Sequence, residues 1–199
     1  PKIMERRLKL VTNAEAFNLS TDEYNHWQKE LDDNCEDFIY GAGKKKYNIK
    51  DDQASKGLAA ICHRANKEKR KIYFSGQGAD EIISDYGFAG IKKYKHSGFG
   101  GLFPASLDGF FPWHSFYDGT QIQYLNKEEY VAGHFGVETR YPFLDNDLVQ
   151  EFLWLSHTLK NSVYKSCLHE YLTRNNFPFK PSEKKGFNVG QKKRKHKTL

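Results

Sequence analysis

The sequence is poor in cysteine, methionine and proline: its 199 residues include three cysteines, one methionine and six prolines. The cysteines Cys35, Cys62 and Cys167 are far apart and form no Cys-x-x-Cys pair. This spacing argues against a disulfide framework or a zinc site and favours a reducing compartment. No stretch approaches the roughly 20 apolar residues that a membrane-spanning helix needs. We therefore expect no membrane contact and a cytoplasmic location, unless a preceding segment carries an organelle address.

The excess of positive charge is concentrated in one short segment. The chain carries 31 Lys and Arg against 25 Asp and Glu, a formal net charge of +6. Five of the basic residues lie within 192–197, so the rest of the chain is nearly neutral. A nucleic-acid partner is therefore not expected, and the basic segment is interpreted as solvated. The apolar content of 38%, rich in Phe and Tyr, excludes a disordered chain and allows one sizeable core.

The order of predicted elements indicates an α/β fold. Residues 72–74, an Ile-Tyr-Phe run before a Gly-rich turn, are predicted to be a strand buried on both faces, as in a parallel sheet. The irregular and aromatic-rich segment 97–119 is interpreted as a long loop packed by its own rings. Apolar periodicity and capping patterns predict helices over 21–33 (with Ser20 and Glu23 as a capping box), from 51 to the charged run 67–71, and over 79–86, 120–135, 146–155 and 162–174.

The first candidate site is the loop Ser75–Glu81, directly after the predicted strand. In open α/β sheets, ligands bind at the carboxyl ends of strands, where loops meet the starts of helices. Small residues such as Gly76 and Gly78 let backbone N–H groups approach a phosphate closely. The carboxylates of Asp80 and Glu81 would suit a Mg²⁺ ion carried with that phosphate. A tight turn with a capping Asp is the alternative, and this segment alone does not decide between the two.

Two later segments offer further polar groups. In Gly136–Asp145, the apolar residues are interpreted as core, Asp145 or the following Asn146 as a helix cap, and Glu138 and Arg140 as a pair across one strand face. The segment Ser182–Phe187 offers two lysine ammonium groups beside a glycine. Each of these two segments, taken by itself, is interpreted as structural or solvated.

Together the three segments resemble the C-terminal synthetase domain of glutamine-dependent asparagine synthetases. That family has a Ser-Gly-Glu-Gly-Ser-Asp-Glu loop, a later Gly-[Leu/Ile/Val]-Glu-x-Arg-x-Pro-Phe-Leu-Asp segment, and a Lys-x-Gly-Phe-like or Lys-Glu-Gln-Phe loop near its end. The matching segments here are Ser75–Glu81, Gly136–Asp145 and Lys184–Phe187, in the same order and with comparable spacing. The ten-residue middle segment is the most specific of the three.

The resemblance implies an adenine nucleotide α-hydrolase-like fold (a PP-loop ATPase), with a mostly helical C-terminal part packed on a parallel sheet. It also implies an ATP-dependent ligase that uses Mg²⁺: a small carboxylate substrate, aspartate or an analogue, attacks the α-phosphate of ATP, and ammonia or an amine then attacks the activated carbonyl to form an amide. The roles implied by position are catalysis for Lys184 and Gln77, nucleotide contact for Ser75, Gly76 and Gly78, Mg²⁺ binding for Asp80, and shaping of the site for Glu81, Glu138 and Arg140.

The chain also departs from the family pattern. Gln77 stands where asparagine synthetases carry Glu, and an amide cannot take a proton from ammonia or balance a cation. Residues 84–86 read Ser-Asp-Tyr where the family has Gly-Gly before Tyr. The upstream phosphate loop Ser-Gly-Gly-x-Asp-Ser is absent, as is a glutaminase domain with its N-terminal Cys. We therefore expect both to lie on a preceding segment or a companion chain.

These observations divide the chain into three parts. Residues 1–44 are expected to be a helical lead-in that matches the family only loosely, 45–190 the C-terminal part of an asparagine-synthetase-like domain, and 191–199 a basic tail. The favoured hypothesis is a ligase that is active when joined to its N-terminal portion. The alternative is a non-catalytic scaffold or assembly subunit that kept the fold and lost the chemistry.

Overall fold

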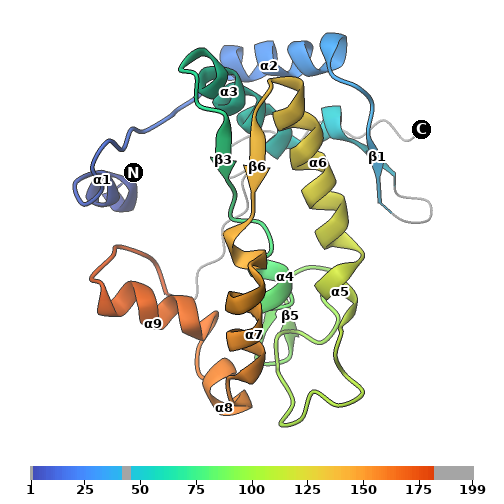
Figure 1. Cartoon of the computed structure of the whole chain (residues 1–199), viewed down its shortest axis with the longest axis vertical. Coiled ribbons are helices and arrows are strands. Elements are labelled where there is room, and N and C mark those ends of the chain that lie inside the picture. The colour runs from blue at the N-terminus through green and yellow to red at the C-terminus, as the bar shows by residue number, and fades with distance from the viewer. Residues whose placement is uncertain (1, 42–45, 182–199) are drawn as a thin grey trace.

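A computed structural model describes residues 2–41 and 46–181, and Figure 1 shows these residues as a mostly helical chain with small sheets. The α-helices are α1 (Lys2–Leu8), α2 (Thr21–Asn34), α3 (Gln53–Lys67), α4 (Ala79–Ile83), α5 (His114–Tyr117), α6 (Thr120–His134), α7 (Asn146–Trp154), α8 (His157–Lys160) and α9 (Ser166–Arg174), and the 3-10 helices are η1 (Ile49–Asp51) and η2 (Pro142–Leu144). The strands are β1 (Ile39–Tyr40), β2 (Tyr47–Asn48), β3 (Ile72–Phe74), β4 (Gly87–Phe88), β5 (Ile91–Lys92) and β6 (Glu138–Arg140). The predicted α/β class is thus confirmed at the coarse level of helices with small sheets.

Strands β3 and β6 form a two-stranded parallel sheet, with Tyr73 opposite Thr139 in the register. A parallel pair needs a crossover connection, and the chain from α4 to α6 supplies it. Tyr73 packs against an apolar cluster that α3 and α6 share, and Thr139 is buried. Both strands end at the same edge of the sheet, above α4 and α7 in Figure 1. The loops that follow the two strands therefore emerge side by side.

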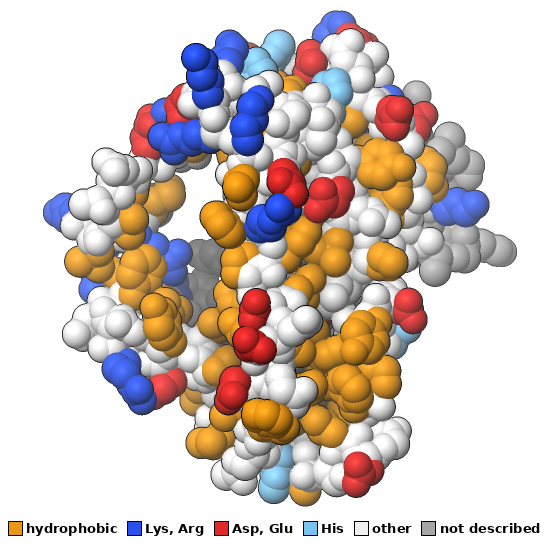
Figure 2. Space-filling view, viewed as in Figure 1, with side chains coloured by type: hydrophobic (Ala, Val, Ile, Leu, Met, Phe, Trp, Pro, Cys, Tyr) orange, Lys and Arg blue, Asp and Glu red, His pale blue; other side chains and the backbone are white. Residues whose placement is uncertain are grey.

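The prediction that residues 72–74 are buried on both faces is wrong. Ile72 is 53% exposed and Phe74 is 69% exposed, whereas Tyr73 between them is half-buried. Alternate side chains of a strand point to opposite faces, and the α3–α6 cluster packs against the Tyr73 face. Figure 2 shows hydrophobic side chains next to an opening beside this sheet, which α1 borders on the other side and α9 from below. The apolar run reflects a strand with one covered face and one open apolar face.

The helix predictions hold where capping signals define the ends. Ser20 Oγ accepts from Glu23 N at 3.2 Å, and Glu23 Oε2 accepts from Ser20 N at 2.8 Å, which is the predicted capping box at the start of α2. The helix predicted over 79–86 ends at Ile83, because the chain then enters a left-handed backbone conformation. The helix predicted from 162 begins at Ser166, after Lys165 with φ +53°.

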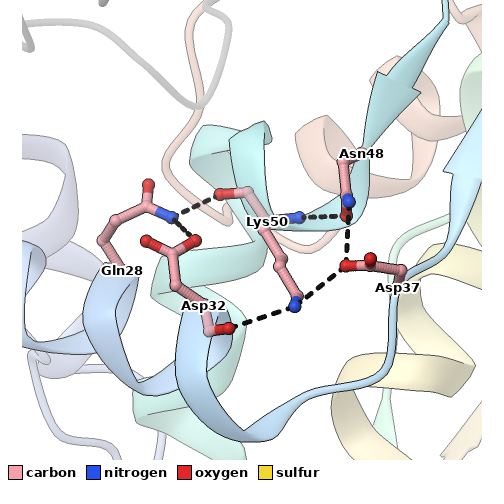
Figure 3. Close-up of polar contacts among 5 residues, drawn as sticks. All are labelled: Gln28, Asp32, Asp37, Asn48 and Lys50. Carbon is pink, nitrogen blue, oxygen red and sulfur yellow. Dashed lines mark hydrogen bonds and ion pairs between the residues drawn. The ribbon is translucent and has the colours of Figure 1, made fainter.

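A polar network fastens the end of α2 to the segment that leads into α3 (Figure 3). Lys50 Nζ lies 2.8 Å from Asp37 Oδ1 and donates to the backbone oxygen of Asp32 at 3.1 Å. Gln28 Nε2 donates to Asp32 Oδ1 and to the backbone oxygen of Lys50, at 2.8 and 2.7 Å. Asn48 caps η1 by accepting from Lys50 N. These bonds join α2 to η1, the turn directly before α3. They therefore help to hold α2 beside α3 and the apolar cluster that contacts Tyr73.

A second core cluster consists mainly of aromatic rings from the irregular segment 97–119. Phe103, Trp113 and Phe116 are buried there, and they pack against Ile82 of α4 and Phe152 of α7. The interpretation of this segment as a loop packed by its own rings is confirmed. Its packing also anchors α4, the helix that follows the candidate loop. In the part of the chain that the structure describes, no helix is long and apolar enough to cross a membrane.

Candidate functional site

The first and second candidate segments meet at the end of the parallel sheet. Ser75 N donates to the backbone oxygen of Arg140 at 2.8 Å, which extends the β3–β6 ladder into both segments. Gly78 lies directly against Leu144: a Cβ at Gly78 would lie 2.7 Å from Leu144 Cγ. The third segment, with Lys184, lies outside the described residues. Two stretches more than fifty residues apart in sequence therefore form one surface, as the resemblance requires.

Some backbone N–H groups of the loop after β3 are already hydrogen-bonded within the loop and the helix that follows it. Ser75 is buried, and its Oγ accepts from Gln77 N at 3.2 Å. Gly78 N donates to Glu81 Oε2 at 3.1 Å, so this N–H is engaged inside the protein. Helix α4 has only five residues, which makes its dipole a weak attraction for an anion. The expected phosphate cradle is therefore reduced in the described residues.

Gly76 is the position of this loop that is open to a ligand. It is exposed, and a Cβ built on it would meet no other atom within 4 Å. A glycine that no neighbour requires leaves room for another molecule to approach the backbone. The backbone at Gly76 is therefore open to solvent, and its contact with a nucleotide stays a prediction.

Glu81 lies inside the protein and does not face the site. It is 1% exposed, accepts from Gly78 N at 3.1 Å, and also accepts from the Tyr86 hydroxyl. Burial raises the pKa of Glu81. Trp113 Nε1 donates to the backbone oxygen of Glu81 at 2.9 Å, which ties the aromatic cluster to the same turn. The expectation that the Glu81 carboxylate would suit Mg²⁺ is therefore wrong, because both of its oxygens are engaged inside the protein, where they hold the loop.

Asp80 points toward the segment before α9. Lys165 Nζ lies 2.7 Å from Asp80 Oδ1, and the Tyr164 hydroxyl donates to the same oxygen at 3.4 Å. Burial, together with the charge of Asp80, raises the pKa of Tyr164 to about 12. The described residues contain no group of three or more metal-ligating side chains. Asp80 thus fits Mg²⁺ only as a single carboxylate beside phosphate oxygens and water, a common arrangement for this ion.

Lys165 and Glu128 are site residues that the sequence analysis missed. Lys165 lies outside all three segments and inside the helix predicted over 162–174, so nothing in the sequence drew attention to it. Glu128 comes from α6, and its Oε1 accepts from Gln77 Nε2 at 3.1 Å. Burial raises the pKa of Glu128, while hydrogen bonding from Ser75 and Gln77 opposes this. In the sequence Glu128 is one of two adjacent glutamates on a helix, a pattern typical of a solvated face.

Glu138 and Arg140 form the predicted pair across one strand face. Their charged groups make an ion pair, and Arg140 Nη1 also donates to the backbone oxygen of Thr139 at 3.2 Å. Both side chains are exposed and lie on the open face of the sheet, beside Ile72 and Phe74. They border the candidate loop without entering it, so the structure places them at the edge of the site.

A groove of about 750 Å³ lies between the 107–121 segment and α7. Its walls combine aromatic side chains, among them Phe111, Tyr117 and Trp154, with polar ones such as Gln121 and Asn146. The predicted nucleotide contacts Ser75, Gly76 and Gly78 do not line it. Leu144, which touches Gly78, belongs to its wall, so the groove and the candidate loop are neighbours that share one side chain.

Comparison of the chain with protein families, with curated proteins and with solved structures finds no match. Any functional assignment therefore rests on the site residues themselves.

Proposed function

We propose that the chain contributes one wall of the active site of an ATP-dependent amide-forming ligase of the asparagine-synthetase type, with an adenine nucleotide α-hydrolase-like fold. The observation that carries the proposal is the parallel pairing of β3 with β6, which brings the loop at Ser75 beside the segment at Arg140. Open α/β sheets bind ligands at this end of their strands. The two segments that resemble the family are thus neighbours in space, an arrangement that the resemblance needs.

The proposed reaction has two steps. First, a carboxylate oxygen of the acid substrate bonds to the α-phosphorus of ATP, and the bond from that phosphorus to the bridging oxygen breaks, releasing pyrophosphate. Second, the nitrogen of ammonia or an amine bonds to the acyl carbon, AMP leaves with the electron pair of the broken C–O bond, and the nitrogen gives one proton to water. The first step is needed because a free carboxylate is a poor electrophile.

The residues of this chain would bind and orient the reactants. Gly76 leaves its backbone open to the nucleotide, and Ser75 and Gly78 fix the shape of the loop around it. Asp80 would contribute one ligand to Mg²⁺, which when bound neutralises the departing pyrophosphate. Lys165 would lie next to the same phosphate oxygens once Asp80 turns to the ion, because the two side chains are paired at 2.7 Å. The role proposed for Lys184 stays a prediction.

The open face of the β3–β6 sheet supports the expectation that a companion chain or a preceding segment packs against it. Parallel sheets are normally covered on both faces, yet here Ile72 and Phe74 are more than half exposed. A companion chain or preceding segment that carried the missing phosphate loop and the glutaminase domain would cover this face. Its strands would extend the sheet and place the phosphate loop beside Ser75.

The test of the proposal is ATP–pyrophosphate exchange, since exchange reports the first step without an amine. The chain is recovered through a tag from cells that make it naturally, so that any companion is retained, and is assayed with aspartate and other small carboxylates. We expect exchange that depends on one acid, and a loss of at least about tenfold in D80N, because an amide is a weaker Mg²⁺ ligand than a carboxylate. The exposed Asp108, changed to Asn, is the control and should keep full exchange. Absence of exchange with every acid would end the proposal.

The alternative function is a non-catalytic scaffold or assembly subunit. The observation that favours it is the engagement of Asp80 by Lys165 and Tyr164, because a carboxylate in an ion pair is not free to bind an ion. A scaffold would form the same companion complex with no exchange activity. Recovery of a stable complex that shows no exchange with any acid would therefore support this alternative.

A further inference from the structure

The groove between the 107–121 segment and α7 is a feature that the proposed function does not use. Its volume of about 750 Å³ lies within the range of small-molecule pockets in proteins, roughly 300–1,000 Å³. Figure 2 shows hydrophobic side chains gathered on the surface around α5 and α7. The predicted nucleotide contacts Ser75, Gly76 and Gly78 do not line this groove, so a ligand in it would occupy a separate site.

Three aromatic rings on the walls of the groove are open to solvent. Trp154 of α7 is 72% exposed, Tyr117 of α5 is 62% exposed, and Phe111 is 38% exposed. Single apolar side chains scattered over a surface are ordinary, whereas several around one groove indicate a binding surface. Aromatic rings pair favourably with other aromatic rings, edge to face or offset. The groove therefore suits a ligand that contains a planar aromatic ring.

Gln121, near the start of α6, places an unpaired acceptor at the same groove. The residue lines the groove and is 8% exposed. Its Oε1 is buried and has no hydrogen-bond partner within residues 2–41 and 46–181, and an unpaired buried acceptor lowers stability. The last torsion of a Gln side chain is soft, so the amide can turn this oxygen into the groove without a change in the backbone. An N–H or O–H group of a ligand would then supply the missing donor.

The charge of the groove disfavours an anionic ligand. Among the described residues that line it there is no Lys, Arg or His. Asp108 is the one charged side chain among those same residues, and because it is exposed, solvent and salt screen its attraction for a cation. The amides of Asn146 and Gln150, on α7, are neutral. The groove therefore matches a neutral ligand.

We propose that this groove binds a small, neutral aromatic ligand that donates an N–H or O–H hydrogen bond to Gln121 Oε1. The exposed rings, Trp154 foremost, supply contact area, and Gln121 selects ligands that carry a donor. The site goes beyond the proposed ligase function and does not depend on it, because the ligand takes no part in the activation of the acid.

The test compares two probes that differ only in the donor: indole, and 1-methylindole, which lacks the N–H group. Each probe is titrated against the full chain, recovered with any companion as for the exchange assay, and its dissociation constant is measured by ligand-observed NMR. We expect indole to bind at least about threefold more tightly than 1-methylindole, as a single hydrogen bond to a buried acceptor allows. In Q121L, which removes the acceptor, this preference should disappear.

Thermal melting shows whether Q121L keeps the fold. Its melting temperature should equal or exceed that of the wild type, because an apolar group of similar size replaces an unpaired buried polar group. The matched control is Q123L: Gln123 is also on α6 but does not line the groove, so the preference for indole should stay. W154A should weaken the binding of both probes at least about threefold, because both lose the same ring contact. Indole-3-carboxylate, the same ring with a negative charge, should bind more weakly than indole.

Each arm of the test can overturn the inference. Loss of the preference in Q121L but not in Q123L, together with weaker binding of both probes by W154A, supports it. Absence of indole binding to the folded chain, an unchanged preference in Q121L, or unchanged binding by W154A overturns it. Binding of indole-3-carboxylate as tight as that of indole overturns the assignment of a neutral ligand. Because no arm measures exchange, this inference and the proposed function fail separately.

Discussion

Replacing Asp85 with alanine is expected to lower the free energy of unfolding by about 3–5 kcal/mol. Asp85 is fully buried, and four donors converge on its carboxylate. Ser97 Oγ and Phe99 N donate to Oδ2 at 3.0 and 2.7 Å, and Gly98 N and Ser115 Oγ donate to Oδ1 at 3.1 and 3.0 Å. The truncation would leave the buried Ser97 and Ser115 hydroxyls and the part-buried N–H groups of Gly98 and Phe99 without this acceptor. The effect is measured by urea unfolding, followed through the fluorescence of the buried Trp113.

Two further variants test whether the lost hydrogen bonds cause the lower stability of D85A. D85N keeps the size of the side chain but turns an NH₂ group toward two of the donors. Its loss in free energy of unfolding should be at least about half that of D85A. D108A, an exposed aspartate in the same irregular segment, should stay within about 0.5 kcal/mol of the wild type. Equal stability of D85A and the wild type would show that the carboxylate does not organise the aromatic segment.

Asp85 also shows what the sequence could and could not predict. The Gly-Gly positions of the resembling family correspond to Ser84 and Asp85, and Asp85 and Tyr86 have φ of +41° and +52°. Asp85 and Tyr86 thus adopt a left-handed backbone without glycine, and short polar side chains such as Asp tolerate it better than most. The sequence shows this departure only as a lack of glycine, because the four donors come from residues 12 to 30 positions away.

The helices could be predicted because their signals are local. The capping box at Ser20 and Glu23 and the cap at Asp145 depend on residues two or three apart, and the structure has both. The exposure of Phe74 could not be predicted, because it depends on which elements cover the sheet. Local sequence patterns likewise do not indicate the contact of Gln77 with Glu128, 51 positions away, or that of Asp80 with Lys165, 85 positions away.

The two glycines of the candidate loop are expected to respond in opposite ways to the same added methyl group. In G78A the Cβ would overlap the Leu144 side chain, and φ of +92° strains any residue but glycine. The combined cost is about 2–5 kcal/mol, from backbone strain and overpacking. In G76A the Cβ would meet no other atom within 4 Å, so stability should stay within about 0.5 kcal/mol of the wild type. Urea unfolding of both variants measures this difference.

Only the Gly76 substitution is expected to affect activity directly, because the nucleotide is proposed to approach the backbone where Gly76 lacks a Cβ. G76A should therefore fold as the wild type does and lose ATP–pyrophosphate exchange at least about tenfold, since a methyl group in a close contact forces the ligand to shift. Full exchange activity in a stable G76A variant would mean that the nucleotide does not lie against this loop. Wild-type stability of G78A would mean that Gly78 and Leu144 are not in contact.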